Sequence, residues 1–180
     1  GRHVDGLVNN AGYGLPGTFF NTSWKEQADF IRVLYTVPIE LTHKLLPGMA
    51  ERNFGRIINV GSIHSLVASP YKSAYVAAKH GLLGFAKTIA LETGDCNVTI
   101  NTICPSYVKT PLVDKQIAAQ AKENGISEEE VVNKIMLEPM PKKQFISLEE
   151  LGETAAFLMS SAARNITGQT MILDGGWTAR

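Results

Sequence analysis

The feature that most constrains the fold is an alternation of short apolar segments with longer amphipathic ones. The short segments are rich in β-branched residues and predict strands at residues 4–8, 56–60, 97–103 and 170–173. The longer ones predict helices between them, at residues 23–46, 73–91, 112–121, from 127 onward and at 147–158. Strands that alternate with helices favour a parallel sheet covered on both faces. We therefore expect an α/β, doubly wound parallel sheet of the Rossmann type, formed by one domain over residues 1–180.

Two sequence signals predict where the first helix begins and where it is interrupted. Ser23 and Glu26 have the spacing of a capping box, which predicts a helix beginning directly after Ser23. Pro38 lies inside the same helical pattern, and its ring removes a backbone donor. We expect Pro38 to kink or divide this helix.

Composition argues against several classes of partner. Seventeen basic and seventeen acidic residues give a formal net charge of zero, which disfavours nucleic acid and anionic membranes as partners. No apolar run is long enough to predict a membrane span, so we expect a cytoplasmic protein. The two cysteines and four histidines lack the spacing of zinc ligands, so no metal site is expected.

Ser62, Tyr75 and Lys79 form the strongest candidate for a catalytic group. Tyr75 and Lys79 are four residues apart in an Ala-rich helical stretch, so their side chains share one helix face. A neighbouring cation favours the phenolate form of tyrosine, which would bring its pKa toward neutral pH. Ser62 lies upstream, after a predicted strand. A hydroxyl, a phenol and an amine in this order point to oxidoreductase chemistry on a carbonyl group, although the Tyr-x-x-x-Lys spacing alone is common by chance.

Further motifs accompany these three residues. Asn9-Asn10-Ala11-Gly12 follows the first strand, and Ile57-Ile58-Asn59-Val60-Gly61-Ser62 spans the second. In order and spacing, the chain from about residue 4 to residue 177 resembles the short-chain dehydrogenase/reductase family. The resemblance implies catalytic roles for Ser62, Tyr75 and Lys79. Tyr75 would exchange a proton with the substrate oxygen, Ser62 would hold that oxygen, and Lys79 would lower the Tyr75 pKa and bind the nicotinamide ribose.

The resemblance also implies a cofactor site and a lid. The cofactor-binding residues it implies are Asn10, Ala11, Gly12, Tyr75, Lys79, Pro105, Val108 and Thr110. Residues 111–140 are similar to a helical substrate lid. The chain matches the C-terminal portion of the family fold, and we expect the N-terminal nucleotide-binding half to lie outside it. The residue that distinguishes NAD from NADP belongs to that half, so NAD is expected from resemblance alone and NADP stays open.

Substrate residues are implied by a narrower resemblance within the family. Ser62, His64, Lys72, Tyr75 and Gln116 are similar to the residues of members that interconvert D-3-hydroxybutyrate and acetoacetate. Lys72 supplies a positive charge, while His64 and Gln116 supply hydrogen-bond donors, which suits a small carboxylate. Each of the three could instead have an ordinary surface or packing role.

Three positions depart from the family pattern. Ser106 replaces a glycine, so a strained backbone is expected if that site needs a positive φ. Leu34 stands where a catalytic asparagine is common, and its side chain has no hydrogen-bonding atom. Gly14 stands where a glutamine would donate to a carboxylate.

Three functions therefore remain open. The first is a dehydrogenase acting on a small 3-hydroxy acid, the second a carbonyl reductase of other specificity, and the third a truncated or degenerate chain that binds without turnover. For an active enzyme, the resemblance implies a homotetramer. Its contacts would be formed by the helices at residues 23–46 and 73–91 and by the C-terminal strand.

Overall fold

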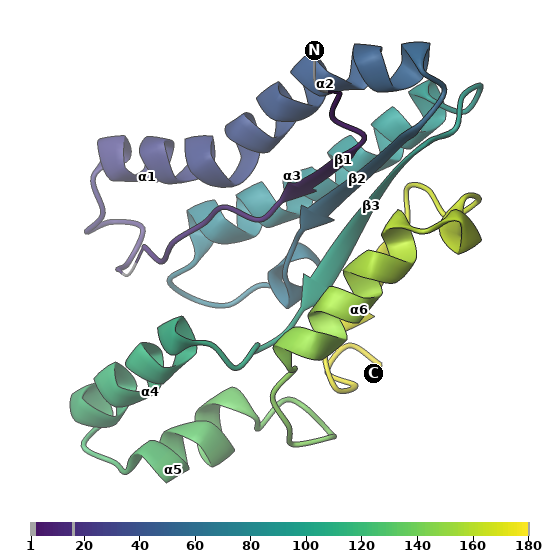
Figure 1. Ribbon diagram of the computed structural model, residues 1–180. Coiled ribbons are helices and arrows are strands. Elements are labelled where there is room, and N and C mark those ends of the chain that lie inside the picture. The colour runs from purple at the N-terminus through teal and green to yellow at the C-terminus, as the bar shows by residue number, and fades with distance from the viewer. Residues whose placement is uncertain (1–2, 16, 180) are drawn as a thin grey trace.

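The computed structural model describes residues 3–15 and 17–179 and has a parallel four-stranded sheet at its centre (Figure 1). The strands lie in the order β1, β2, β3, β4, with bounds Gly6–Asn9, Gly55–Val60, Val98–Pro105 and Thr170–Leu173. All four expected strands are present. β1 begins later than expected, and β3 continues two residues further, to Pro105. The prediction of an α/β fold with a parallel sheet is confirmed.

Helices cover both faces of this sheet (Figure 1). On one face, Ile57 and Ile100 pack with Met49 of α2 (Val37–Glu51) and with α3 (Ser73–Glu92). On the other face, Ile58 and Ile103 pack with Leu158 of α6 (Leu148–Met159). Because side chains alternate along a strand, β2 and β3 supply apolar residues to both layers at once.

The first helical segment is continuous, with one widened turn. α1 (Trp24–Ile31) begins with the expected capping box of Ser23 and Glu26. It runs into a π-helical turn, Arg32–Thr36, and then into α2. Pro38 follows this turn and has no N–H to donate to a carbonyl one turn earlier. The wider π turn accommodates the proline without ending the helix.

The segment after β3 forms a helical pair of its own. α4 (Pro111–Asn124) and α5 (Glu128–Val131) are followed by a π turn, Val132–Met136, and they project beyond the carboxyl end of β3 (Figure 1). Their apolar side chains form a separate cluster that includes Val113, Ile117, Val131 and Met136. This pair matches the helices expected within residues 111–140.

Short connections complete the fold. A 3₁₀ turn, Ile63–Ser65, follows β2, and another, Ser161–Ala163, follows α6; neither was expected from the sequence. None of the helices within residues 3–15 and 17–179 is both long enough and apolar enough to cross a membrane.

Candidate active site

The catalytic residues expected from the sequence gather at the carboxyl ends of the strands. Ser62 lies two residues beyond the end of β2, while Tyr75 and Lys79 lie on the first turns of α3. The carboxyl edge of a parallel sheet is where open α/β folds bind their ligands. The fold therefore places the three residues in the region where ligand binding is expected.

Ser62 is held by the short turn that follows it. Its side-chain oxygen accepts a hydrogen bond from the backbone N–H of His64 at 3.1 Å, and its own N–H donates to Ser65 Oγ. Gly61 makes this approach possible. A Cβ at position 61 would lie within 3.0 Å of side-chain atoms of Thr102, Cys104 and Ser65. Glycine is thus required for close packing directly before Ser62.

Lys79 is buried, and its ammonium is held by the carboxyl end of β2. Nζ donates to the backbone oxygen of Val60 at 2.6 Å and lies 5.7 Å from the centre of the Tyr75 ring. Burial lowers the pKa of Lys79 to about 8, and the nearby Cys104 acts weakly in the opposite direction. The amine is therefore poised to titrate close to neutral pH.

Tyr75 differs from the expectation in its electrostatics. Burial raises the pKa of its phenol, and the interaction with the Ser62 side chain only partly opposes this rise. Lys79 is not among the groups that shift the Tyr75 pKa, because its ammonium is directed at Val60. In this structure Ser62 therefore favours the phenolate, in the role expected for Lys79.

His64 and Lys72 lie beside Tyr75 and contact each other. Lys72 Nζ is 3.0 Å from His64 Nε2, and the His64 ring stands edge-on to Tyr75 with ring centres 6.0 Å apart. Burial and the charge of Lys72 lower the pKa of His64 to about 4, so the imidazole is neutral at pH 7. Burial also lowers the pKa of Lys72. No acidic side chain of the described residues forms an ion pair with Lys72.

Two aromatic residues that were not predicted as site residues extend this cluster. Trp177 stands edge-on to His64 with ring centres 6.3 Å apart, and it stacks on Tyr107 at 6.4 Å. Asp174 fixes the turn that carries Trp177 by accepting hydrogen bonds from the backbone N–H groups of Gly176 and Thr178. The Asp-Gly-Gly turn before the tryptophan was the sequence signal that could have identified it.

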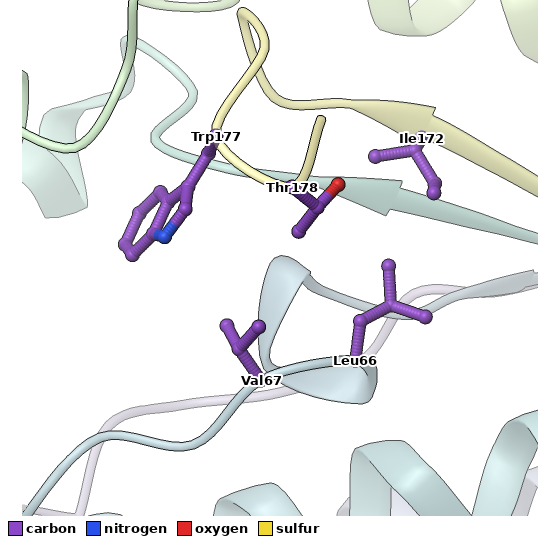
Figure 2. Close-up of a pocket in the computed structure, with 5 residues that line it drawn as sticks. All are labelled: Leu66, Val67, Ile172, Trp177 and Thr178. Atoms are coloured by element: carbon purple, nitrogen blue, oxygen red, sulfur yellow. The ribbon is translucent and has the colours of Figure 1, made fainter. Parts of the chain in front are cut away.

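A pocket of about 530 Å³ lies beside this aromatic cluster. Figure 2 shows its lining: Leu66, Val67, Ile172, Trp177 and Thr178. None of these side chains is charged. The pocket therefore offers an uncharged surface, whereas the charge needed to bind an anion lies on the Tyr75 side of His64.

The expected cofactor residues after β1 lie at the same edge of the sheet. Asn10, Ala11 and Gly12 are exposed there. The side-chain link between the neighbouring strands β1 and β2 is made by Asn9, whose Nδ2 donates to Asn59 Oδ1 at 2.9 Å. Asn9 points into the sheet, and the exposed stretch that follows is free to line a ligand site.

The second expected cofactor segment begins where β3 ends, at Pro105. Ser106 does not have a positive φ, so its side chain causes none of the backbone strain that was considered for this position. Its N–H donates to Leu173 of β4 at 2.8 Å. Val108 pairs with Ile146, and the Thr110 hydroxyl caps α4 by accepting from Val113. These contacts tie the expected cofactor segment to the helical pair.

Gln116 is separated from the other expected substrate residues. It lies half-buried on α4, and no hydrogen bond joins it to His64, Lys72 or Tyr75. The structure brings Ser62, His64, Lys72 and Tyr75 together and leaves Gln116 on the helical pair.

Leu34 lies in the π turn and is 2% exposed. It packs in a cluster with Phe30, Ala74 and Ala78, against which Tyr75 also packs. A Cβ at Gly12 would lie 3.0 Å from a Leu34 methyl group. The side chain therefore supports the Tyr75 ring by packing and offers no hydrogen bond.

Comparison with known proteins agrees with this arrangement. The model of a family described as enoyl-(acyl carrier protein) reductase matches residues 1–178. D-beta-hydroxybutyrate dehydrogenases of Rhizobium meliloti and Cupriavidus necator are 46% and 47% identical over 177 residues, covering 98% of this chain and 69% of each relative. An uncharacterized oxidoreductase of Bacillus subtilis is 39% identical over 179 residues. The chain belongs to the short-chain dehydrogenase/reductase family.

Membership in the short-chain dehydrogenase/reductase family makes this protein an oxidoreductase and implies a nicotinamide cofactor. The donor set of the site fits such a group. The Lys79 ammonium has three N–H donors, and within the described residues only Val60 accepts from it. Two donors remain for a ribose hydroxyl beside Tyr75, at the edge of the sheet where a dinucleotide is expected.

Proposed function

We propose that this short-chain dehydrogenase interconverts D-3-hydroxybutyrate and acetoacetate with NAD as its cofactor. The observation that carries the proposal is the Lys72 ammonium, which is half-buried beside Tyr75 without an acidic partner in the described residues. A desolvated cation without a counter-ion is costly unless an anion joins it. Two relatives, 46% and 47% identical, are named D-beta-hydroxybutyrate dehydrogenases, which is consistent with a small hydroxy acid as substrate.

The proton would move through Tyr75. In the oxidation direction, the phenolate takes the proton of the substrate hydroxyl while the hydride leaves the adjacent carbon. A bound nicotinamide cofactor would supply the acceptor for that hydride. Ser62 donates a hydrogen bond to the substrate oxygen and favours the phenolate, as its effect on the Tyr75 pKa indicates. Lys79 would hold the ribose through the donors that Val60 leaves free.

The substrate carboxylate would lie against Lys72. Its ammonium keeps donors free beyond the one directed at His64, and the neutral imidazole accepts without competing for the anion. Gln116 would join when the α4–α5 pair closes over the site, which is our proposal for residues 111–140 as a lid. NAD rather than NADP is proposed from the family resemblance.

A carbonyl reductase of other specificity is the second candidate, and Gly14 favours it. Glycine supplies no donor at a position where a carboxylate-binding glutamine was expected, and nothing lies within 4 Å of where its Cβ would be. A site with fewer donors holds an anion less firmly.

Steady-state kinetics of the full-length protein would decide between them. We expect D-3-hydroxybutyrate to be oxidised with a kcat/KM at least about 10-fold above that for its neutral methyl ester, the equivalent of one charge-assisted hydrogen bond. Equal values for acid and ester would favour the carbonyl reductase. No turnover of either substrate, with NAD or NADP, would support the degenerate chain.

We also infer a cytoplasmic homotetramer from the family resemblance. Exposed apolar side chains on α2, α3 and β4 support the expected contacts: Leu41, Leu91 and Ile172 are 40%, 84% and 44% exposed. Exposed apolar surface of this kind is characteristic of subunit interfaces. Sedimentation equilibrium at micromolar concentration should give four times the subunit mass, and a monomer would contradict the inference.

A further inference from the structure

Gln27 is a buried polar residue at the substrate side of Tyr75 that the mechanism above does not use. It lies on α1, is 6% exposed, and lines the same small pocket as Lys72 and Tyr75. Within residues 3–15 and 17–179, no hydrogen bond to its carboxamide is found. Buried polar side chains nearly always have a hydrogen-bond partner. The carboxamide atoms of Gln27 are not among the fully enclosed side-chain atoms that lack a partner, so a group that enters this pocket can reach them.

The helix itself offers no reason for a glutamine at this position. Residues 27, 30 and 34 recur at the spacing of one helix face, and this face is buried. Phe30 and Leu34 on that face are apolar and pack beneath Tyr75. An apolar side chain at 27 would continue the same packing. Gln27 is thus a polar exception on a face that otherwise supports the catalytic ring.

The charge in the pocket indicates which ligand group would bind. Lys72 is the one cationic side chain among its described lining residues, and no acidic side chain lines it. A carboxylate accepts about four hydrogen bonds, more than one ammonium can donate in a single direction. The two N–H donors of the Gln27 carboxamide could meet oxygens that Lys72 leaves unsatisfied.

We propose that the Gln27 carboxamide donates to the substrate carboxylate alongside Lys72 and so determines specificity for a hydroxy acid. This inference rests on the proposed function, because it requires an anionic substrate at Lys72. Gly14 contributes no donor to this site. Gln27 reaches the pocket from α1 and supplies a donor of the kind that Gly14 lacks.

The test is to compare Gln27→Met and Gln27→Glu with the parent, using D-3-hydroxybutyrate and its methyl ester as substrates. Methionine keeps the length of the side chain and removes both donors, so KM for the acid should rise about 10-fold or more while KM for the ester changes less than about twofold. Glutamate should raise KM for the acid further, because like charges repel. Gln169→Met, on the exposed turn before β4, is the matched control and should leave both values unchanged.

The outcomes separate this inference from the proposed function. If the parent prefers the acid and Lys72→Met removes that preference, but both Gln27 variants retain it, Gln27 packs in the pocket without binding substrate. If the parent shows no preference for the acid, the proposed function fails and this inference fails with it. Should Gln27→Met not fold, Gln27→Glu still decides, since a carboxylate that leaves the acid KM unchanged contradicts the proposal.

Discussion

Lys72 Nζ donates to His64 Nε2 over 3.0 Å, and this contact joins the one free cation among the described lining residues of the small pocket to a neutral imidazole. The acceptor nitrogen must be unprotonated, so the two groups cannot both be charged without repulsion. Burial and the charge of Lys72 lower the pKa of His64 to about 4, so the imidazole is neutral at pH 7 and adds no repulsion to the Lys72 ammonium beside Tyr75.

His64 should make stability depend on pH. Its pKa is about 4 in the native protein and about 6.5 when unfolded, so between these values only the unfolded chain binds the proton. The free energy of unfolding should therefore fall as pH falls from 6.5 toward 4. Between pH 7 and pH 5, the free energy of unfolding of His64→Gln should fall by less than that of the parent. The difference between the two decreases should be on the order of 1 kcal/mol after allowance for solvent screening.

Urea denaturation at the two pH values measures this difference. His43→Gln, at an exposed position on α2, serves as the control. A parent and a His64→Gln variant with the same pH dependence would show that His64 is not buried in its neutral form.

Tyr75→Phe should abolish turnover, because it removes the transferable proton and keeps the ring that packs on Leu34. We expect kcat to fall by at least about 100-fold, the lower end of general acid–base contributions. Tyr35→Phe, which alters a phenol on the π turn, should retain parental activity, and circular dichroism checks that both variants fold. Activity of Tyr75→Phe within about tenfold of the parent would refute the assignment of Tyr75.

Lys79→Met should weaken cofactor binding without moving the rising limb of the pH profile of oxidation, because Lys79 is not among the groups that shift the Tyr75 pKa. KM for the cofactor should rise, since the ribose would lose a donor. Lys87→Met, two turns further along α3 and exposed, is the control. If the cofactor KM matches that of the parent, Lys79 serves only to anchor Val60.

Leu34→Asn should destabilise the protein. The side chain is 2% exposed in an apolar cluster, so an amide there would be buried without a partner at a cost of about 1–3 kcal/mol. Leu34→Met, which nearly conserves volume, should cost less than about 1.5 kcal/mol. Equal unfolding free energies for the parent and Leu34→Asn would mean that the cluster contains space or a polar partner for the amide.

The sequence predicted the helices and strands of the fold more reliably than the turns that connect them. The four strands and the capping boxes at Ser23 and Ser147 were predictable, because their signals are local. The π turn at Arg32–Thr36 was not. A proline in a helical pattern is consistent with a kink, a break or a widened turn, and packing against α3 decides between them.

The same distinction applies to the site. Tyr75 and Lys79 share a helix face, so their proximity followed from spacing. Lys72 and His64 are eight residues apart across an irregular turn, and their contact depends on the left-handed backbone at Tyr71, with φ of 64°. Gln27 and Trp177 are far from Tyr75 in sequence, and only the assembled fold brings them to the substrate side.

The charge of Lys72 decides whether this enzyme recognises the carboxylate of its substrate. Lys72→Met should be assayed for kcat/KM with D-3-hydroxybutyrate and with its neutral methyl ester, in the full-length protein. We expect a loss of about 10- to 150-fold for the acid, which corresponds to a charge-assisted contact of about 1.5–3 kcal/mol, and little change for the ester. An equal loss for both substrates would show that Lys72 supports the fold or Tyr75, and that the enzyme does not recognise a carboxylate there.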